Sequence, residues 1–112
     1  MEIHDERVGN TCVVTAKGRL DGGASSTFTD RIGGLIASPK PKLLIDFSGI
    51  DFVTSAGLRA VLVLVKKVNS AGGSFALCCV QDSVREVLDI TGFTSMISIH
   101  PARADALAAL GG

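Results

Sequence analysis

The segment from Leu43 to Val68 joins two apolar runs of different periodicity, and this junction constrains the fold most. The first run, Leu43-Leu44-Ile45-Asp46-Phe47, is continuous, as in a strand buried on both faces. The second has helical spacing. Thr54-Ser55-Ala56-Gly57-Leu58 lies between them. Hydroxyl residues therefore stand at a helix N-terminus, where free backbone N–H groups and the helix dipole favour a negative group such as phosphate.

Two extended segments and a helix precede the junction. Glu2 to Arg7 and Thr11 to Lys17 are separated by Val8-Gly9-Asn10, a break of hairpin length, so we expect an antiparallel pair. Helical spacing predicts a first helix from Gly22 to about Ala37. Its inward positions are Phe28, Ile32, Leu35 and Ile36. Ser38-Pro39-Lys40-Pro41 ends this helix, and the next strand runs from Lys42 to Phe47.

The second helix is predicted from about Ser55 to Asn69, and Ala71-Gly72-Gly73 ends it. Its inward stripe consists of Leu58, Val61, Leu62, Val65 and Val68. A strand follows from Ser74 to Val80. Asp82 is the predicted N-cap of a third helix that ends at Thr91-Gly92. The inward positions of that helix are Val84, Val87, Leu88 and Ile90.

A short strand around Ile97 to Ile99 and a helix from Pro101 to Leu110 complete the chain. Strand and helix alternate from Lys42 onward, which predicts right-handed crossovers and a mostly parallel sheet. We therefore expect an α/β fold with about five strands, an N-terminal antiparallel hairpin and about four helices. A chain of 112 residues predicts a single domain over residues 1–112.

Charge and composition exclude several classes of partner. Eleven basic and eleven acidic residues cancel, and neither sign forms a long block, so a nucleic-acid or polybasic membrane surface is not expected. No apolar stretch is long enough to span a membrane, and the N-terminus lacks the pattern of a signal peptide. The sequence predicts a cytoplasmic protein that does not insert into a membrane.

The reactive residue types do not form a familiar catalytic or metal-binding pattern. Cys12, Cys78 and Cys79 lie in apolar runs without the paired spacing of a zinc site, so we interpret them as reduced core residues. His4 and His100 are far apart in the sequence and have too little support from nearby Cys or acidic residues to indicate a metal site. Neither the nucleophile elbow Gly-x-Ser-x-Gly nor a phosphate-binding loop is present. We expect no enzyme, no metal and no cofactor.

The segment LLIDFSGIDFVTSAGLRAVLVLVKKV, preceded by GRLDGGASSTF, resembles the STAS family of sulfate-transporter domains and bacterial anti-sigma factor antagonists. For the antagonists, the resemblance implies a partner switch. A serine kinase that is also an anti-sigma factor uses ATP to phosphorylate this loop, and a metal-dependent serine/threonine phosphatase reverses the step. The unmodified antagonist binds the kinase and frees the sigma factor.

The resemblance also indicates the phosphate acceptor. One form of the loop is Asp-Ser-Ser-Gly, with phosphate on the serine before glycine, and Ala56 stands at that position here. Other members have Ser-Ala-Gly, which points to Ser55, with Thr54 as the reserve. The alternative is that either hydroxyl only caps the second helix, although no Glu or Gln completes a capping box.

A partner surface is predicted around this loop and along the second helix. At 100° per residue the core stripe leaves Ala60, Val63 and Lys67 on the far side and Leu64 at its border. Asp21 ends the second matching segment and is interpreted as interfacial. The predicted partner-binding residues are Asp21, Thr54, Ser55, Ala56, Gly57, Arg59, Ala60, Val63 and Lys67.

Three residue roles stay open at this level. Gly57 either admits the kinase or lets the helix approach the sheet closely. Asp46 and Asp51 either fix loops by hydrogen bonds or belong to the recognition surface. Our first hypothesis for the whole chain is a phosphorylation-controlled anti-sigma factor antagonist. The alternative is an accessory STAS subunit of a transporter or lipid-trafficking complex that is not phosphorylated.

Overall fold

The computed structural model describes residues 1–36 and 38–111. It shows a five-stranded mixed sheet with four α-helices. In the sheet each strand lies beside the next one in the chain: β1 (Glu2–Val8), β2 (Thr11–Leu20), β3 (Lys42–Val53), β4 (Ser74–Cys78) and β5 (Ser98–His100). β1 pairs antiparallel with β2, and the remaining neighbours pair in parallel. The predicted α/β fold with its N-terminal hairpin is confirmed.

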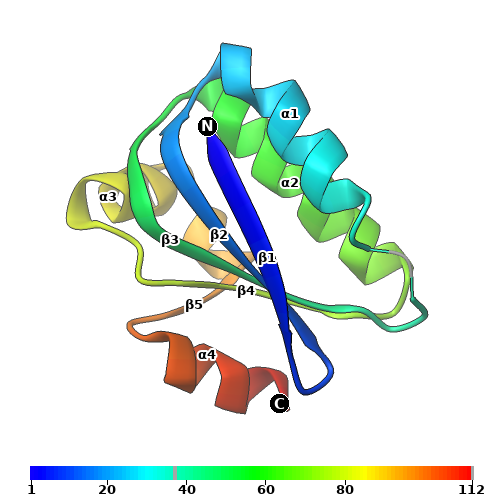
Figure 1. Ribbon diagram of the computed structural model, residues 1–112. Coiled ribbons are helices and arrows are strands. Elements are labelled where there is room, and N and C mark those ends of the chain that lie inside the picture. The colour runs from blue at the N-terminus through cyan, green and yellow to red at the C-terminus, as the bar shows by residue number, and fades with distance from the viewer. Residues whose placement is uncertain (37, 112) are drawn as a thin grey trace.

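The helices cover the two faces of the sheet unequally. They are α1 (Gly22–Gly33), α2 (Ser55–Ser70), α3 (Asp82–Ile90) and α4 (Arg103–Leu110). Figure 1 shows α1 and α2 side by side along one side of the sheet and α4 on the other. The larger core lies under α1, α2 and α3, and a smaller apolar cluster lies under α4. No helix of the described chain has the length and apolar character of a membrane span.

Successive residues of β3 point alternately to the two faces of the sheet and contribute to both apolar clusters. Leu43, Ile45 and Phe47 belong to the larger core, whereas Leu44 belongs to the cluster under α4. This double burial explains the continuous apolar run in the sequence. The strand continues to Val53, six residues beyond the predicted end, because β2 continues beside it.

The extra pairing joins Lys17 to Gly49 and Leu20 to Val53, with register shifts along β2. Both strands therefore end later than predicted, and the junction loop is short. The first helix ends at Gly33, earlier than predicted. The predicted end at Ala37 lies outside the described residues, while Leu35 and Ile36 pack against the core from beyond the helix.

Several other predicted boundaries are wrong by a few residues. β4 ends at Cys78 rather than Val80, because Cys79 has a left-handed φ of 59° that breaks the strand. Gln81 is the N-cap of α3, and Asp82 is its first residue. Pro101 precedes α4, which begins at Arg103. The sequence did not predict the short 3-10 helix η1 (Phe93–Ser95) that follows α3.

Two predictions about helix faces are also wrong. Ile90 was expected to face inward, but it is 78% exposed at the end of α3. On α2, Ala60 and Leu64 are 4% and 1% exposed, respectively, whereas Leu62 is only half-buried. α2 has α1 beside it as well as the sheet beneath it, so its buried face is wider than the predicted stripe. Val63 is 53% exposed, as expected.

We predict that Ala60→Lys destabilises the fold far more than Val63→Lys. A lysine at position 60 would place a charged chain in the buried face of α2, which should lower the free energy of unfolding by more than about 2 kcal/mol. The same substitution at Val63 should stay within about 0.5 kcal/mol. Urea unfolding of both variants measures the two changes in unfolding free energy. Equal changes would contradict the assignment of Ala60 to the buried face of α2 and of Val63 to its exposed face.

Candidate functional site

The junction between β3 and α2 gives Thr54 a structural task. Thr54 has an extended backbone and is the N-cap of α2, and its Oγ1 accepts a hydrogen bond from the Gly57 N–H at 3.3 Å. Its own N–H donates to the Leu20 carbonyl at 3.1 Å, which ties the start of α2 to the end of β2. Thr54 therefore caps α2.

Ser55 is the first residue of α2 and is exposed. Within residues 1–36 and 38–111 its hydroxyl makes no hydrogen bond, so it is free for chemistry that the Thr54 hydroxyl is not. The first turn of α2 contains no acidic residue. The positive end of the helix dipole therefore lacks a compensating side-chain charge beside Ser55.

Gly57 sets how closely α2 approaches the sheet. A Cβ atom at this position would lie 2.2 Å from the Leu20 carbonyl oxygen and 2.9 Å from the Leu20 Cγ. Gly57 is buried, so it is not available as the surface contact that was predicted. Of the two interpretations of this glycine, close helix approach is the one that the structure supports.

The two segments that carried the family resemblance meet at this edge of the sheet. Asp21 is the N-cap of α1, and its Oδ1 accepts from the Ala24 N–H at 3.1 Å. A Cβ atom on Gly22, the next residue, would lie 3.8 Å from the Ala56 Cβ. The start of α1 and the start of α2 thus form one surface that includes Ser55. A contact between Asp21 and a partner stays a prediction.

Arg19 and Phe52 extend this surface along the ends of β2 and β3. They are register partners, and the Arg19 guanidinium lies over the exposed Phe52 ring at 4.2 Å from its centroid. The Arg19 Nε is 4.0 Å from an Asp21 carboxylate oxygen. Sequence reasoning missed this pair, because neither residue stands out until the two strands extend beyond their predicted ends.

The predicted surface along α2 is reduced to its exposed members. Arg59 and Val63 face solvent. The Lys67 Nζ donates to the Gly33 carbonyl at 3.0 Å, so this lysine helps to end α1. Ala60 lies in the core, and the prediction that it faces outward is wrong.

Asp46 is a structural acceptor, one of the two alternatives that the sequence left open. One carboxylate oxygen accepts from the Ser48 N–H at 2.8 Å, and the other accepts from the Arg103 Nη2 at 2.9 Å. Burial alone would raise the pKa of Asp46, but the hydrogen bonds from Ser48 and Arg103 together hold it below its ordinary value. Asp51, by contrast, is exposed.

Arg103 is the residue of this network that the sequence did not indicate. Besides Asp46, its guanidinium contacts the Glu6 carboxylate at 2.8 Å and the Thr15 hydroxyl at 3.1 Å. It thus joins α4 to three strands of the sheet. Cys78 lies in the same region, where burial and its neighbours raise the pKa of its thiol to about 12. Cys78 is buried as predicted, whereas Cys12 and Cys79 are half-buried.

This chain is similar to STAS domains and to anti-sigma factor antagonists in both sequence and structure. A family model described as the STAS domain matches residues 2–106. Two relatives are each 25% identical to this chain. BtrV of Bordetella bronchiseptica matches over 97% of this chain and 94% of its own length. The anti-sigma F factor antagonist of Paenibacillus polymyxa matches over 98% of this chain and 95% of its own length. The crystal structure of an anti-sigma factor antagonist from Mycobacterium paratuberculosis is 25% identical, with a TM-score of 0.88 over 99% of this chain and 94% of that one.

The different tasks of the two hydroxyls predict different stability effects. Thr54→Val removes the N-cap acceptor and should lower the free energy of unfolding by about 1 kcal/mol. Ser55→Ala removes no hydrogen bond and replaces serine by a better helix former, so it should stay within about 0.5 kcal/mol of the parent. Chemical denaturation of the two variants checks this order, and a larger loss for Ser55→Ala would show that the capping assignment is wrong.

The Asp46 network predicts a specific loss of stability in acid. Because the folded-state pKa lies below the unfolded value of about 3.9, the stabilisation is complete above that value and is lost as pH falls through the folded pKa. Asp46→Asn should therefore show a weaker dependence of unfolding free energy on pH below about pH 4 than the parent chain. Asp51→Asn is the matched control and should follow the parent, because it leaves Asp46 and its partners in place.

Proposed function

Because the chain belongs to the STAS domain family, we propose that it is an anti-sigma factor antagonist that releases its partner when Ser55 is phosphorylated. The unmodified chain binds a serine-kinase anti-sigma factor through the surface around the starts of α1 and α2. The kinase transfers phosphate from ATP to Ser55, and a serine/threonine phosphatase removes it. The chain itself performs no catalytic step.

The observation that carries this proposal is the free hydroxyl of Ser55 at the N-terminus of α2. Ser55 is exposed, whereas the neighbouring Thr54 hydroxyl is engaged as the helix cap. Phosphorylation of Thr54 would use the oxygen that accepts the Gly57 N–H hydrogen bond and so disturb the helix cap. Phosphorylation of Ser55 leaves that hydrogen bond in place. This favours Ser55 as the acceptor even though Ala56 stands next to the glycine.

The local electrostatics also favour a phosphate at Ser55. The first turn of α2 has no acidic side chain, so a dianion there would interact with an uncompensated helix N-terminus. Arg59 is exposed four residues later, on the same face of the helix. An acidic group followed by a basic one at this spacing is the favourable order on a helix.

The same phosphate would oppose the complex. The surface next to Ser55 includes the Asp21 carboxylate. When this surface binds a partner, the polar groups on it lose their bound water. A dianion added there increases the cost of that desolvation and introduces repulsion toward acidic groups of the partner. The accessible residues proposed for the interface are Asp21, Thr54, Ser55 and Ala56 at the starts of α1 and α2, with Arg59, Val63 and Lys67 further along α2.

Capture of the partner tests the binding half of the proposal. A tagged chain and its Ser55→Asp variant are incubated with extract of the source cells, and bound proteins are identified by mass spectrometry. We expect the unmodified chain to retain a kinase-type anti-sigma factor and the acidic variant to lose it. Retention of a permease or transport ATPase in place of a kinase would contradict the proposal and favour an accessory transport subunit.

Phosphate mapping with the captured kinase and ATP tests the modification half. Ser55→Ala should abolish incorporation, because its reactive hydroxyl is gone. Thr54→Val is the matched control, since it removes the adjacent hydroxyl and should still be labelled at Ser55. Full labelling of Ser55→Ala would refute the assigned acceptor.

A further inference from the structure

A second group of reactive side chains lies on the face of the sheet that α4 covers, opposite α1 and α2. Asp46 and Cys78 are register partners on the adjacent parallel strands β3 and β4. Their side chains therefore stand next to each other on one face of the sheet. Cys78 is fully buried in the cluster under α4, and Asp46 contacts α4 through Arg103.

Cys79 joins this group because of its unusual backbone. Successive residues of a strand point to opposite faces, so Cys79 in an extended conformation would face the larger core together with Leu77. Its φ of 59° instead ends β4, and the side chain packs against the cluster that contains Cys78. Two adjacent cysteines thus present their sulfur atoms on the same side of the sheet.

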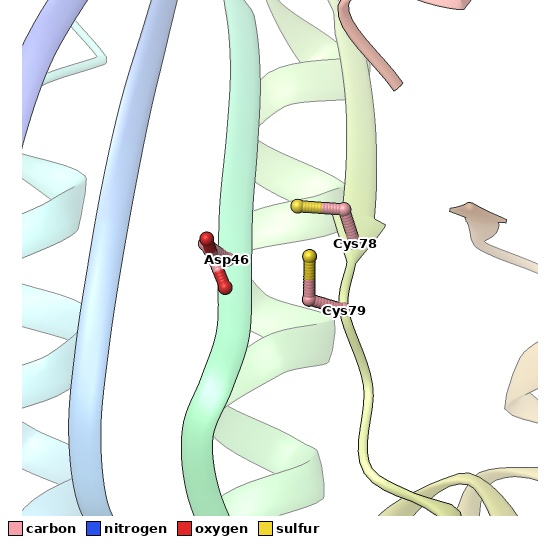
Figure 2. A group of neighbouring side chains, drawn as sticks. All are labelled: Asp46, Cys78 and Cys79. Atoms are coloured by element: carbon pink, nitrogen blue, oxygen red, sulfur yellow. The ribbon is translucent and has the colours of Figure 1, made fainter. Parts of the chain in front are cut away.

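The three side chains converge. The Cys78 and Cys79 sulfur atoms and an Asp46 carboxylate oxygen all lie within 4.8 Å of one another, and Figure 2 shows both sulfurs on the side of β4 that faces Asp46. The carboxylate is already oriented by the Ser48 N–H and the Arg103 guanidinium. Hydrogen bonds of this kind hold a carboxylate in place for a metal without using all of its lone pairs.

We propose that Cys78, Cys79 and Asp46 form a binding site for a thiophilic divalent cation, of which Zn²⁺ is the best match. Two thiolates select Zn²⁺ over the hard cations, and a carboxylate oxygen is an accepted third ligand. Small side-chain rotations would bring the three atoms to zinc–ligand distances of about 2.0–2.3 Å. Water occupies the fourth position, which the half-buried Cys79 leaves accessible.

Charge and proton balance are consistent with such a site. Two thiolates and the Asp46 carboxylate carry three negative charges. The dication offsets two of them, and the Arg103 guanidinium, which is shared with Glu6, lies beside the third. The ion takes the place of the two thiol protons, which pass to solvent. Binding would link the middle of β3 to the end of β4, on the face of the sheet that α4 covers.

Metal titration of the reduced full-length chain tests the site. The protein is stripped with a chelator, kept in a phosphine reductant and titrated with Zn²⁺ or Co²⁺. We expect one ion per chain, sulfur-to-cobalt charge-transfer absorption and a higher melting temperature with Zn²⁺, because the ion binds the folded chain. Failure to bind either ion at micromolar protein concentration would overturn the proposal.

Matched variants identify the ligands. Cys79→Ser and Asp46→Asn should each weaken Zn²⁺ binding by more than about tenfold. Cys12→Ser is the control, because Cys12 packs against the larger core on the other face of the sheet. Circular dichroism of the stripped proteins verifies that each variant is folded. Loss of binding in Cys12→Ser, or unchanged binding in both Cys79→Ser and Asp46→Asn, would show that the ion is not held at this site.

Discussion

The close approach of α2 to the end of β2 is the constraint on which the functional surface depends. The backbone of Gly57 lies so near the Leu20 carbonyl that no side chain fits between them, and the same carbonyl accepts a hydrogen bond from Thr54. These contacts fix the residue at which α2 begins. They give Thr54 the cap position and leave Ser55 exposed one residue later. Which hydroxyl is free thus follows from backbone packing.

The two faces of the sheet have separate tasks. One carries α1 and α2, whose N-termini form the surface proposed for partner binding and phosphorylation. The other carries α4, which Arg103 joins to Asp46, Thr15 and Glu6. A modification at Ser55 can therefore change the binding surface while the contacts under α4 stay intact. The proposed metal site lies within that second group of contacts and should add to stability without altering the switch.

The order and type of the elements could be predicted because apolar spacing changes cleanly along the chain and glycine or proline marks most breaks. The ends of β2 and β3 could not, since each continues only because the other lies beside it. Ala60 was misplaced because a small residue contributes little to an apolar stripe, yet it packs in the wide buried face that α2 presents to α1 and the sheet. Arg103 and Asp46 lie 57 positions apart, so no local pattern links them.

We propose that a phosphate on Ser55 breaks a complex without damaging the fold. The most direct test measures the affinity for the anti-sigma factor and the melting temperature on the same two samples, unmodified and stoichiometrically phosphorylated at Ser55. For the phosphorylated sample we expect an affinity at least about tenfold lower, equivalent to about 1.4 kcal/mol, and a melting temperature that is unchanged or higher. Equal affinities, or a loss of affinity accompanied by a clearly lower melting temperature, would contradict it.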